Sequence, residues 1–162
     1  WFNVGDESDI IMIPELGEGS LLPDLNNQCR NNIKNFVSLG GTLIMFEPNS
    51  GDLINLLNTI FNFNLSSDSI SGDIKLTGNG QDLFTNLTKI IPNNDGSHGI
   101  STSTLPNNSV AMYKSESQTS VVVKIPYVNG KIYVLGWDWY DAKPIGNQDG
   151  GWLKLLEKIL EA

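Results

Sequence analysis

Two continuous apolar runs, separated by an amphipathic segment, constrain the fold of this chain more than any other feature. Residues 9–16 and 42–46 are rich in β-branched and large apolar side chains without polar alternation, as expected for strands buried on both faces. The segment 27–39 between them carries apolar residues at helical spacing, namely Cys29, Ile33, Phe36 and Val37. Gly40 and Gly41 follow, where a helix commonly ends on a left-handed residue. The order strand, helix, strand predicts a right-handed crossover between parallel strands, and therefore an α/β fold.

A second helix is expected directly after this unit. Asp52 stands where a capping residue is preferred, and the apolar stripe that follows is Leu53, Leu56, Leu57, Ile60 and Phe61. Burying five such side chains stabilises a fold by on the order of 10 kcal/mol before entropy is counted. Residues 64–108 predict a loop-rich stretch with short strands such as 74–76 and 87–91.

The last third of the chain predicts antiparallel strands and a terminal helix. Strands are expected at 110–114, 120–127 and 131–137, and the turn Val128-Asn129-Gly130 joins the last two as a hairpin. After Asp149, one helical face is formed by Trp152, Leu155, Leu156, Ile159 and Leu160. We therefore expect a mixed, partly parallel sheet with a C-terminal antiparallel hairpin and a terminal helix packed on it.

Composition limits the classes of partner. At 162 residues the chain matches one domain, 1–162, and its net charge of −8 disfavours nucleic acid and anionic membranes, which bind clustered Lys and Arg. Cys29 is the only cysteine, so an intrachain disulfide is impossible. Charged residues make up only 17% of the chain, and this favours an extracellular or cell-surface location. Because the chain opens at Trp1, we expect a piece of a longer polypeptide.

Several of these segments together resemble a known family. The apolar run at 9–16, the segment Phe-Val-Ser-Leu-Gly-Gly-Thr-Leu-Ile-Met-Phe at 36–46, and Gly-Lys-Ile-Tyr-Val-Leu-Gly-Trp-Asp-Trp-Tyr-Asp at 130–141 are similar to class I glutamine amidotransferase-like domains. The resemblance covers about two thirds of the chain and implies a flavodoxin-like, three-layer α/β domain. It also implies that the opening strand-helix-strand unit of such domains is missing here, and that it lies upstream or is supplied by another chain.

The catalytic members of that family carry a cysteine in a sharp turn after a core strand and a His-x-Glu pair near the end. In this sequence the corresponding turn reads Glu47-Pro48-Asn49, and no His-x-Glu is present. The resemblance therefore implies a divergent member that lacks the catalytic Cys and His. We expect no catalytic residue, no cofactor and no metal.

Carboxylates and aromatic residues near predicted strand ends are the candidate binding residues. Open α/β sheets bind ligands beyond the carboxyl ends of their strands, where Glu15, Glu18, Glu47, Asp138 and Asp141 would converge. Paired carboxylates serve acid and base chemistry on glycosides. The segment 136–141 adds Trp137, Trp139 and Tyr140, whose faces suit sugar rings, although strand alternation places at least one pair in the core. The candidate set is Glu47, Asp138, Trp139, Tyr140 and Asp141.

The remaining reactive side chains favour ordinary roles. His98 is the only histidine and is expected in a solvated polar loop, 93–99, which lacks the full ligand pattern of a calcium loop. Cys29 lies on the apolar stripe of its helix, as expected for a core cysteine rather than a nucleophile. Glycosylation sequons begin at Asn64, Asn86 and Asn107.

These features favour a non-catalytic extracellular structural or interaction module, part of a larger surface protein or self-assembling fibre. Its expected partners are other copies or other domains of the same polypeptide, bound through a sheet edge or an apolar face, with glycans as a further class. The alternative is a carbohydrate-active hydrolase or a sugar-binding module that uses the strand-end carboxylates and the aromatic residues of 136–141.

Overall fold

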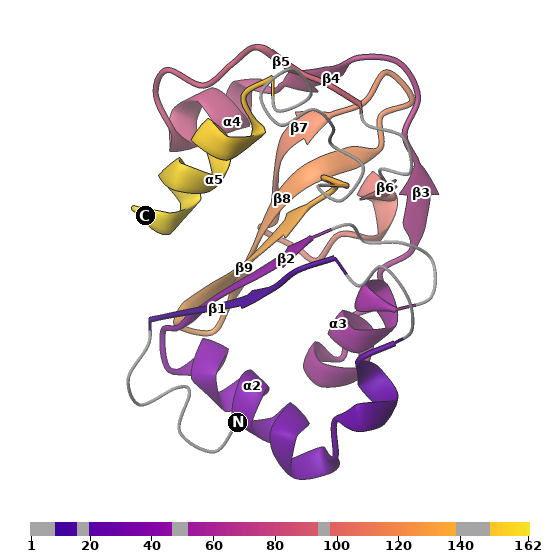
Figure 1. Ribbon diagram of the computed structural model, residues 1–162, viewed down its shortest axis with the longest axis vertical. Coiled ribbons are helices and arrows are strands. Elements are labelled where there is room, and N and C mark those ends of the chain that lie inside the picture. Colours follow the sequence, from indigo (N-terminus) through magenta and orange to yellow (C-terminus); the bar gives the residue numbers. More distant parts are fainter. Residues whose placement is uncertain (1–8, 16–19, 47–51, 94–97, 139–149) are drawn as a thin grey trace.

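The computed structural model describes residues 9–15, 20–46, 52–93, 98–138 and 150–162, and Figure 1 shows helices on both faces of a sheet. The helices are α2 (Asn27–Ser38), α3 (Leu53–Phe61), α4 (Gly78–Leu83) and α5 (Trp152–Leu160), with short 3-10 helices η1 (Leu22–Asp24) and η2 (Thr102–Thr104). The strands are β1 (Ile10–Ile13), β2 (Thr42–Phe46), β3 (Ser67–Ser69), β4 (Ile74–Leu76), β5 (Ile90–Ile91), β6 (His98–Ile100), β7 (Val110–Lys114), β8 (Ser120–Tyr127) and β9 (Gly130–Leu135). The expected α/β class is confirmed.

The sheet is parallel at one side and antiparallel at the other. Its order is β1-β2-β9-β8-β7-β4-β5, with β6 pairing to both β3 and β8. β1, β2 and β9 are parallel, and β8, β7, β4 and β5 continue antiparallel. The expected parallel pair β1–β2, with α2 between its strands in the chain, and the expected hairpin β8–β9 are both confirmed.

Local sequence explains both ends of α2. The Asn26 side chain accepts a hydrogen bond from the Cys29 backbone N–H at 2.9 Å, which caps the first turn. At the other end, the Gly41 N–H donates to the Phe36 carbonyl and the Gly40 N–H to the Val37 carbonyl, which is the Schellman pattern. Gly40 has φ +121°, so the expected left-handed glycine is confirmed.

The start of α3 differs from the expectation. Asp52 occupies the N-cap position, but its side chain makes no capping hydrogen bond, and its backbone is already in the right-handed helical region. A capping side chain requires an extended residue, so the prediction that Asp52 caps α3 is wrong. The helix is stabilised instead by burial of the stripe Leu53, Leu56, Leu57, Ile60 and Phe61, each at most 5% exposed.

The hairpin turn also differs in detail. Val128 and Asn129 form the loop, and Gly130 is the first residue of β9, paired with Tyr127. Val128 has φ +52°, an uncommon conformation for a β-branched residue. Gly130 is required for another reason, because a Cβ there would lie 2.1 Å from the Val37 carbonyl oxygen at the end of α2. The glycine permits a close approach of helix and strand.

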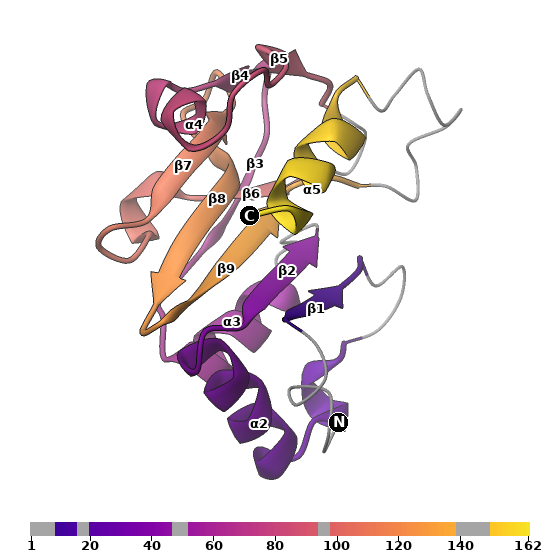
Figure 2. The same cartoon turned by 90° about the vertical axis from the view of Figure 1, so that its left-hand side faces the viewer.

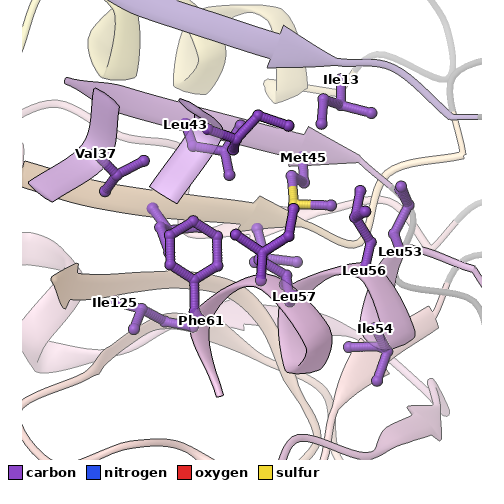
Figure 3. Close-up of a cluster of buried hydrophobic side chains, with 14 of the residues drawn as sticks. Ile13, Val37, Leu43, Met45, Leu53, Ile54, Leu56, Leu57, Phe61 and Ile125 are labelled. Carbon is purple, nitrogen blue, oxygen red and sulfur yellow. The ribbon is translucent and has the colours of Figure 1, made fainter. Parts of the chain in front are cut away.

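Two hydrophobic clusters fill the two faces of the sheet. The first packs α2 and α3 on the sheet, and Figure 3 shows Leu56, Leu57 and Phe61 of α3 gathered around Met45 and Leu43 of β2. The second packs α5 on the opposite face through Trp152, Leu155 and Ile159. Figure 2 shows α5 and α4 on that face, away from α2 and α3. The three-layer arrangement expected from the family resemblance is therefore present in the described residues.

The middle of the chain is loop-rich, as predicted, with β4 at the expected position and β5 shorter than expected. Helix α4 was not expected. Thr77 begins it by accepting a hydrogen bond from the Gly80 N–H at 3.0 Å. Gly80 also lets α4 lie against β7, since a Cβ there would lie 2.4 Å from the Met112 carbonyl oxygen. None of the helices in the described part of the chain has the length and apolar character that a membrane crossing requires.

Candidate functional site

The carboxyl ends of the three parallel strands lie next to one another. Ile13 of β1 is paired with Met45 of β2, and Met45 is paired with Val134 of β9. The chain leaves this edge through Pro14 and Glu15 after β1, and through 136–138 after β9. The edge where open α/β sheets bind ligands is therefore the edge at which Glu15 and Asp138 follow their strands.

Of the candidate binding residues, Asp138 lies within the part of the chain that the structure describes. It is only 6% exposed, although it is a carboxylate beyond the end of a strand. Buried carboxylates require polar partners, so this position is more constrained than a surface aspartate. Glu15, at the end of β1, is half-buried. Glu18, Glu47, Trp139, Tyr140 and Asp141 lie outside the described residues.

Trp137 belongs to the core rather than to a sugar platform. Its side chain is 4% exposed and stacks on Trp152 of α5, with ring centroids 5.7 Å apart and an interplanar angle of 4°. Phe46 of β2 lies beside it at 6.2 Å. The hypothesis that Trp137 stacks on a sugar is wrong, because its ring face is already covered by another indole. Trp137 is therefore a core residue, and Trp139, its expected neighbour on the same strand face, lies outside the described residues.

His98 lies close to the residues that follow β9. The expectation of a solvated loop histidine is wrong. It begins β6, is half-buried, and is paired with Ser69 of β3. A Cβ on Gly136 would lie 2.2 Å from the His98 carbonyl oxygen, so the start of β6 runs against the residues that follow β9. The alternation of His98 with the fully buried Ile100 is the sequence signal that could have indicated a strand here.

Other candidates are dispersed. Within the described residues no group of three His, Cys, Asp or Glu side chains is arranged to hold a metal ion. Residues 94–97 of the polar loop that was compared with a calcium-binding loop lie outside the described part of the chain. Cys29 is half-buried and packs at the margin of the α2–α3 cluster, which agrees with a packing role. Asn64, Asn86 and Asn107 are all exposed.

Comparison with known proteins identifies the fold. No protein-family model and no curated protein matches the chain. Cytoplasmic protein STM1381 of Salmonella typhimurium LT2 is 17% identical over 93% of this chain and 71% of its own, with a TM-score of 0.65. Cytoplasmic protein STM3548 of Salmonella typhimurium is 13% identical over 96% of this chain and 73% of its own, with a TM-score of 0.57.

A part of a larger enzyme has the same fold. An exo-β-1,4-mannosidase from Opitutaceae bacterium strain TAV5 is 12% identical, with a TM-score of 0.51. The match covers 96% of this chain but 24% of the mannosidase, so the chain spans about a quarter of that enzyme's length. At these identities the likeness shows the fold alone, a three-layer α/β domain with a mixed sheet.

Proposed function

We propose that this chain, whose sequence resembles class I glutamine amidotransferase-like domains, is a non-catalytic association module that packs against another copy of the same polypeptide through the β1 edge. The observation that carries the proposal is the open side of β1. This strand pairs with β2 alone, and no other strand of the described residues lies on its outer side. An unpaired strand edge is a template for strand addition.

An apolar surface adjoins this edge. Met12 of β1 is 38% exposed, and Leu160 of α5 is 42% exposed although the sequence placed it on the buried face. With Trp152, Leu155 and Ile159 turned to the sheet, helical geometry places Leu156 and Leu160 on one flank of α5. Figure 2 shows α4 on one side of α5 and β1 on the other. The open edge of β1, with the exposed Met12 on it, forms a surface suited to a second protein.

The lack of recognisable catalytic machinery supports the same proposal. The sequence directly after β2 reads Glu47-Pro48-Asn49, where the catalytic members of the resembled family carry cysteine. Cys29 lies instead on α2, and His98 on β6 is followed by glycine and isoleucine rather than by x-Glu. The mannosidase, in which this fold makes up about a quarter of the chain, is an example of such a domain within a larger protein.

Sedimentation velocity over a concentration series tests the association. Met12→Lys places a charge on the exposed side chain at the β1 edge, and we expect it to weaken self-association at least tenfold. Ile90→Lys is the matched control, because Ile90 is 49% exposed on β5 at the opposite end of the sheet order. Equal effects of both variants contradict the β1 interface. A wild-type chain that stays monomeric at millimolar concentration rules out a second copy and leaves another domain as the occupant.

Sugar binding is a second candidate, favoured by the burial of Asp138 at the carboxyl edge of the sheet and by the likeness to a glycosidase. Calorimetric titration with a β-1,4-linked mannooligosaccharide tests it. The candidate predicts saturable binding that Asp138→Asn and Trp139→Ala each weaken at least tenfold. Unchanged affinity in both variants removes it.

An extracellular location with glycans on the three sequons is proposed from composition and from the exposure of Asn64, Asn86 and Asn107. The two Salmonella proteins are described as cytoplasmic. Expression through a eukaryotic secretory pathway followed by intact-mass measurement tests glycan attachment. The proposal predicts added mass that disappears when the three asparagines are changed to glutamine, and an unmodified secreted chain contradicts it.

A further inference from the structure

Helices α2 and α3 border a polar hollow that the sequence did not indicate. Both helices cover the same face of the sheet (Figure 1). The hollow has a volume of about 360 Å³ and is lined by Asn27, Arg30, Asn31, Lys34, Thr59 and Ile60. That volume lies within the range of small-molecule sites.

The charge of this hollow opposes that of the whole chain. The net charge is −8 and Arg30 is the only arginine, yet Arg30 and Lys34 lie one helical turn apart on the same hollow. Neither forms an ion pair with a carboxylate in the described part of the chain, where the ion pairs involve Lys75 and Lys158. Like charges four residues apart destabilise a helix, so helix stability does not explain the pair.

The Arg30 guanidinium is held in place but has unused donors. Its Nη2 donates to the Leu22 carbonyl at 2.9 Å, which fixes the group against η1. Its Nε is buried without an acceptor among the described residues, so it is closed to a ligand. Nη1 also has no acceptor there but is not enclosed, so its donors are open to solvent. Guanidinium groups bind carboxylates and phosphates strongly, and an oxyanion in the hollow would accept from Nη1.

The rest of the lining adds neutral polar groups and a favourable dipole. The side chains of Asn27, Asn31, Lys34 and Thr59 make no hydrogen bond within the residues that the structure describes. The hollow lies along the first turns of α2, a helix of 12 residues whose amino-terminal end carries partial positive charge. Amides and a hydroxyl pair well with hydroxyl groups of a ligand.

We propose that this hollow binds a small hydroxylated molecule that carries one phosphate or carboxylate group. Arg30 and Lys34 bind the oxyanion, and Asn27, Asn31 and Thr59 bind the hydroxylated body. A lone oxyanion would occupy only a part of the volume, which is why the ligand has a polar body. The site is independent of the β1 edge, so association and ligand binding fail or succeed separately.

Nitrogen-15 chemical-shift titrations with glucose 6-phosphate, glucuronate, glucose and inorganic phosphate test the proposal. We expect both charged sugars to shift amide signals of α2 and α3 saturably, with dissociation constants at least tenfold below that of glucose. The stronger of the two identifies phosphate or carboxylate as the group recognised. Inorganic phosphate is expected to bind the same residues more weakly. The absence of saturable shifts in α2 and α3 with both charged sugars overturns the proposal.

Matched variants separate a specific site from general charge attraction. Arg30→Gln is expected to weaken binding of the preferred charged sugar at least tenfold, Arg30→Lys by a smaller factor because it retains the charge, and Lys34→Gln several-fold. Lys154→Gln makes the same charge change at an exposed position on α5 and is expected to leave binding unchanged. Equal weakening by Lys34→Gln and Lys154→Gln contradicts the site. Because Lys34→Gln leaves the Arg30 contact with η1 intact, this comparison stands even if Arg30→Gln fails to fold.

Discussion

The two faces of the sheet differ in where their covering helices lie in the sequence and in the side chains that form their cores. On the α2–α3 face, both covering helices lie next to β1 and β2 within the first 61 residues, and the mainly aliphatic core also includes side chains from β6, β8 and β9. On the α5 face, the helix from the end of the chain packs on residues from β2, β4, β5, β7, β8 and β9, and the core includes Trp137, Trp152, Tyr113 and Tyr133. One face is covered by helices that are neighbours of β1 and β2 in the sequence, and the other is covered by a helix from the far end of the chain.

This difference decides how each face responds to mutation. The α2–α3 face has many moderate contributions from side chains that repeat along two helices. The α5 face depends on a few large aromatic side chains that join distant segments, because the nine residues of α5 offer fewer positions for burial than α2 and α3 together. Aromatic side chains bury 150–250 Å² each, so single substitutions on this face have large effects.

The largest expected effect is that of Trp152→Ala. The indole is fully buried, stacks on Trp137, and donates from its Nε1 to the Pro92 carbonyl at 3.1 Å. We expect the free energy of unfolding to fall by about 4 kcal/mol, against about 3 kcal/mol for Leu57→Ala on the opposite face. Urea denaturation measures both. Lys154→Ala on the exposed side of α5 is the control, and a smaller loss for Trp152→Ala than for Leu57→Ala contradicts the comparison.

The next effect is a loss of stability at high pH that belongs to the α5 face. Burial raises the pKa of Tyr113 and of Tyr133 from 10.0 to about 12. Both phenols are nearly inaccessible, and the Tyr113 hydroxyl donates to the Thr88 carbonyl at 2.7 Å. Because the folded-state pKa is raised, the stabilisation is complete below pH 10 and is lost as the pH rises toward 12. The loss amounts to at most about 3 kcal/mol for each tyrosine.

Tyr133→Phe isolates this contribution. Urea denaturation between pH 8 and 12 is expected to show a shallower alkaline decline in Tyr133→Phe than in the wild-type chain. Leu57→Ala, on the α2–α3 face, is expected to lower the free energy of unfolding equally at each pH and to leave its dependence on pH unchanged. An unchanged slope in Tyr133→Phe shows that the phenol is not the titrating group.

The smallest expected effect on stability is the loss of the side-chain cap of α2, on the α2–α3 face. Asn26→Ala removes the side-chain acceptor that caps α2, and the free energy of unfolding is expected to fall by about 1 kcal/mol. Asn26→Asp keeps the acceptor and is expected to retain the wild-type stability. Hydrogen exchange should increase in the first turn of α2 alone. Increased exchange across α5 as well would contradict the separation of the two faces.

The elements that the sequence predicted well are those whose sequence patterns span only a few residues. The runs at 42–46 and 120–127 coincide with β2 and β8, and the helix expected at 27–39 is α2, one residue shorter. Capping and apolar spacing act within a few residues, so they can be read from the chain. Asp52 shows the limit, because its residue type suits a cap but its backbone conformation does not.

The candidate site was harder to predict than the fold. Asp138 and Trp137 are neighbours in the sequence, and only the structure shows that Trp137 is covered by Trp152. His98 changed from an expected loop residue to a strand residue because β3 and β8 supply pairing partners for β6. The spacing of Arg30 and Lys34, four residues apart, can be read from the sequence. The hollow that both residues line is also formed by Thr59 and Ile60 of α3, and only the structure shows this.

The sequence by itself determined the α/β class, the parallel β1–β2 pair with its intervening helix, the hairpin and the terminal helix, because periodicity, capping and turn residues operate over short distances. The tertiary structure alone decided which side chains remain exposed and which meet. Leu160, on the apolar stripe of α5, is exposed because the helix turns that flank away from the sheet, and Gly130 is needed because α2 ends against it. Such contacts depend on how distant segments pack, a relation that no local pattern contains.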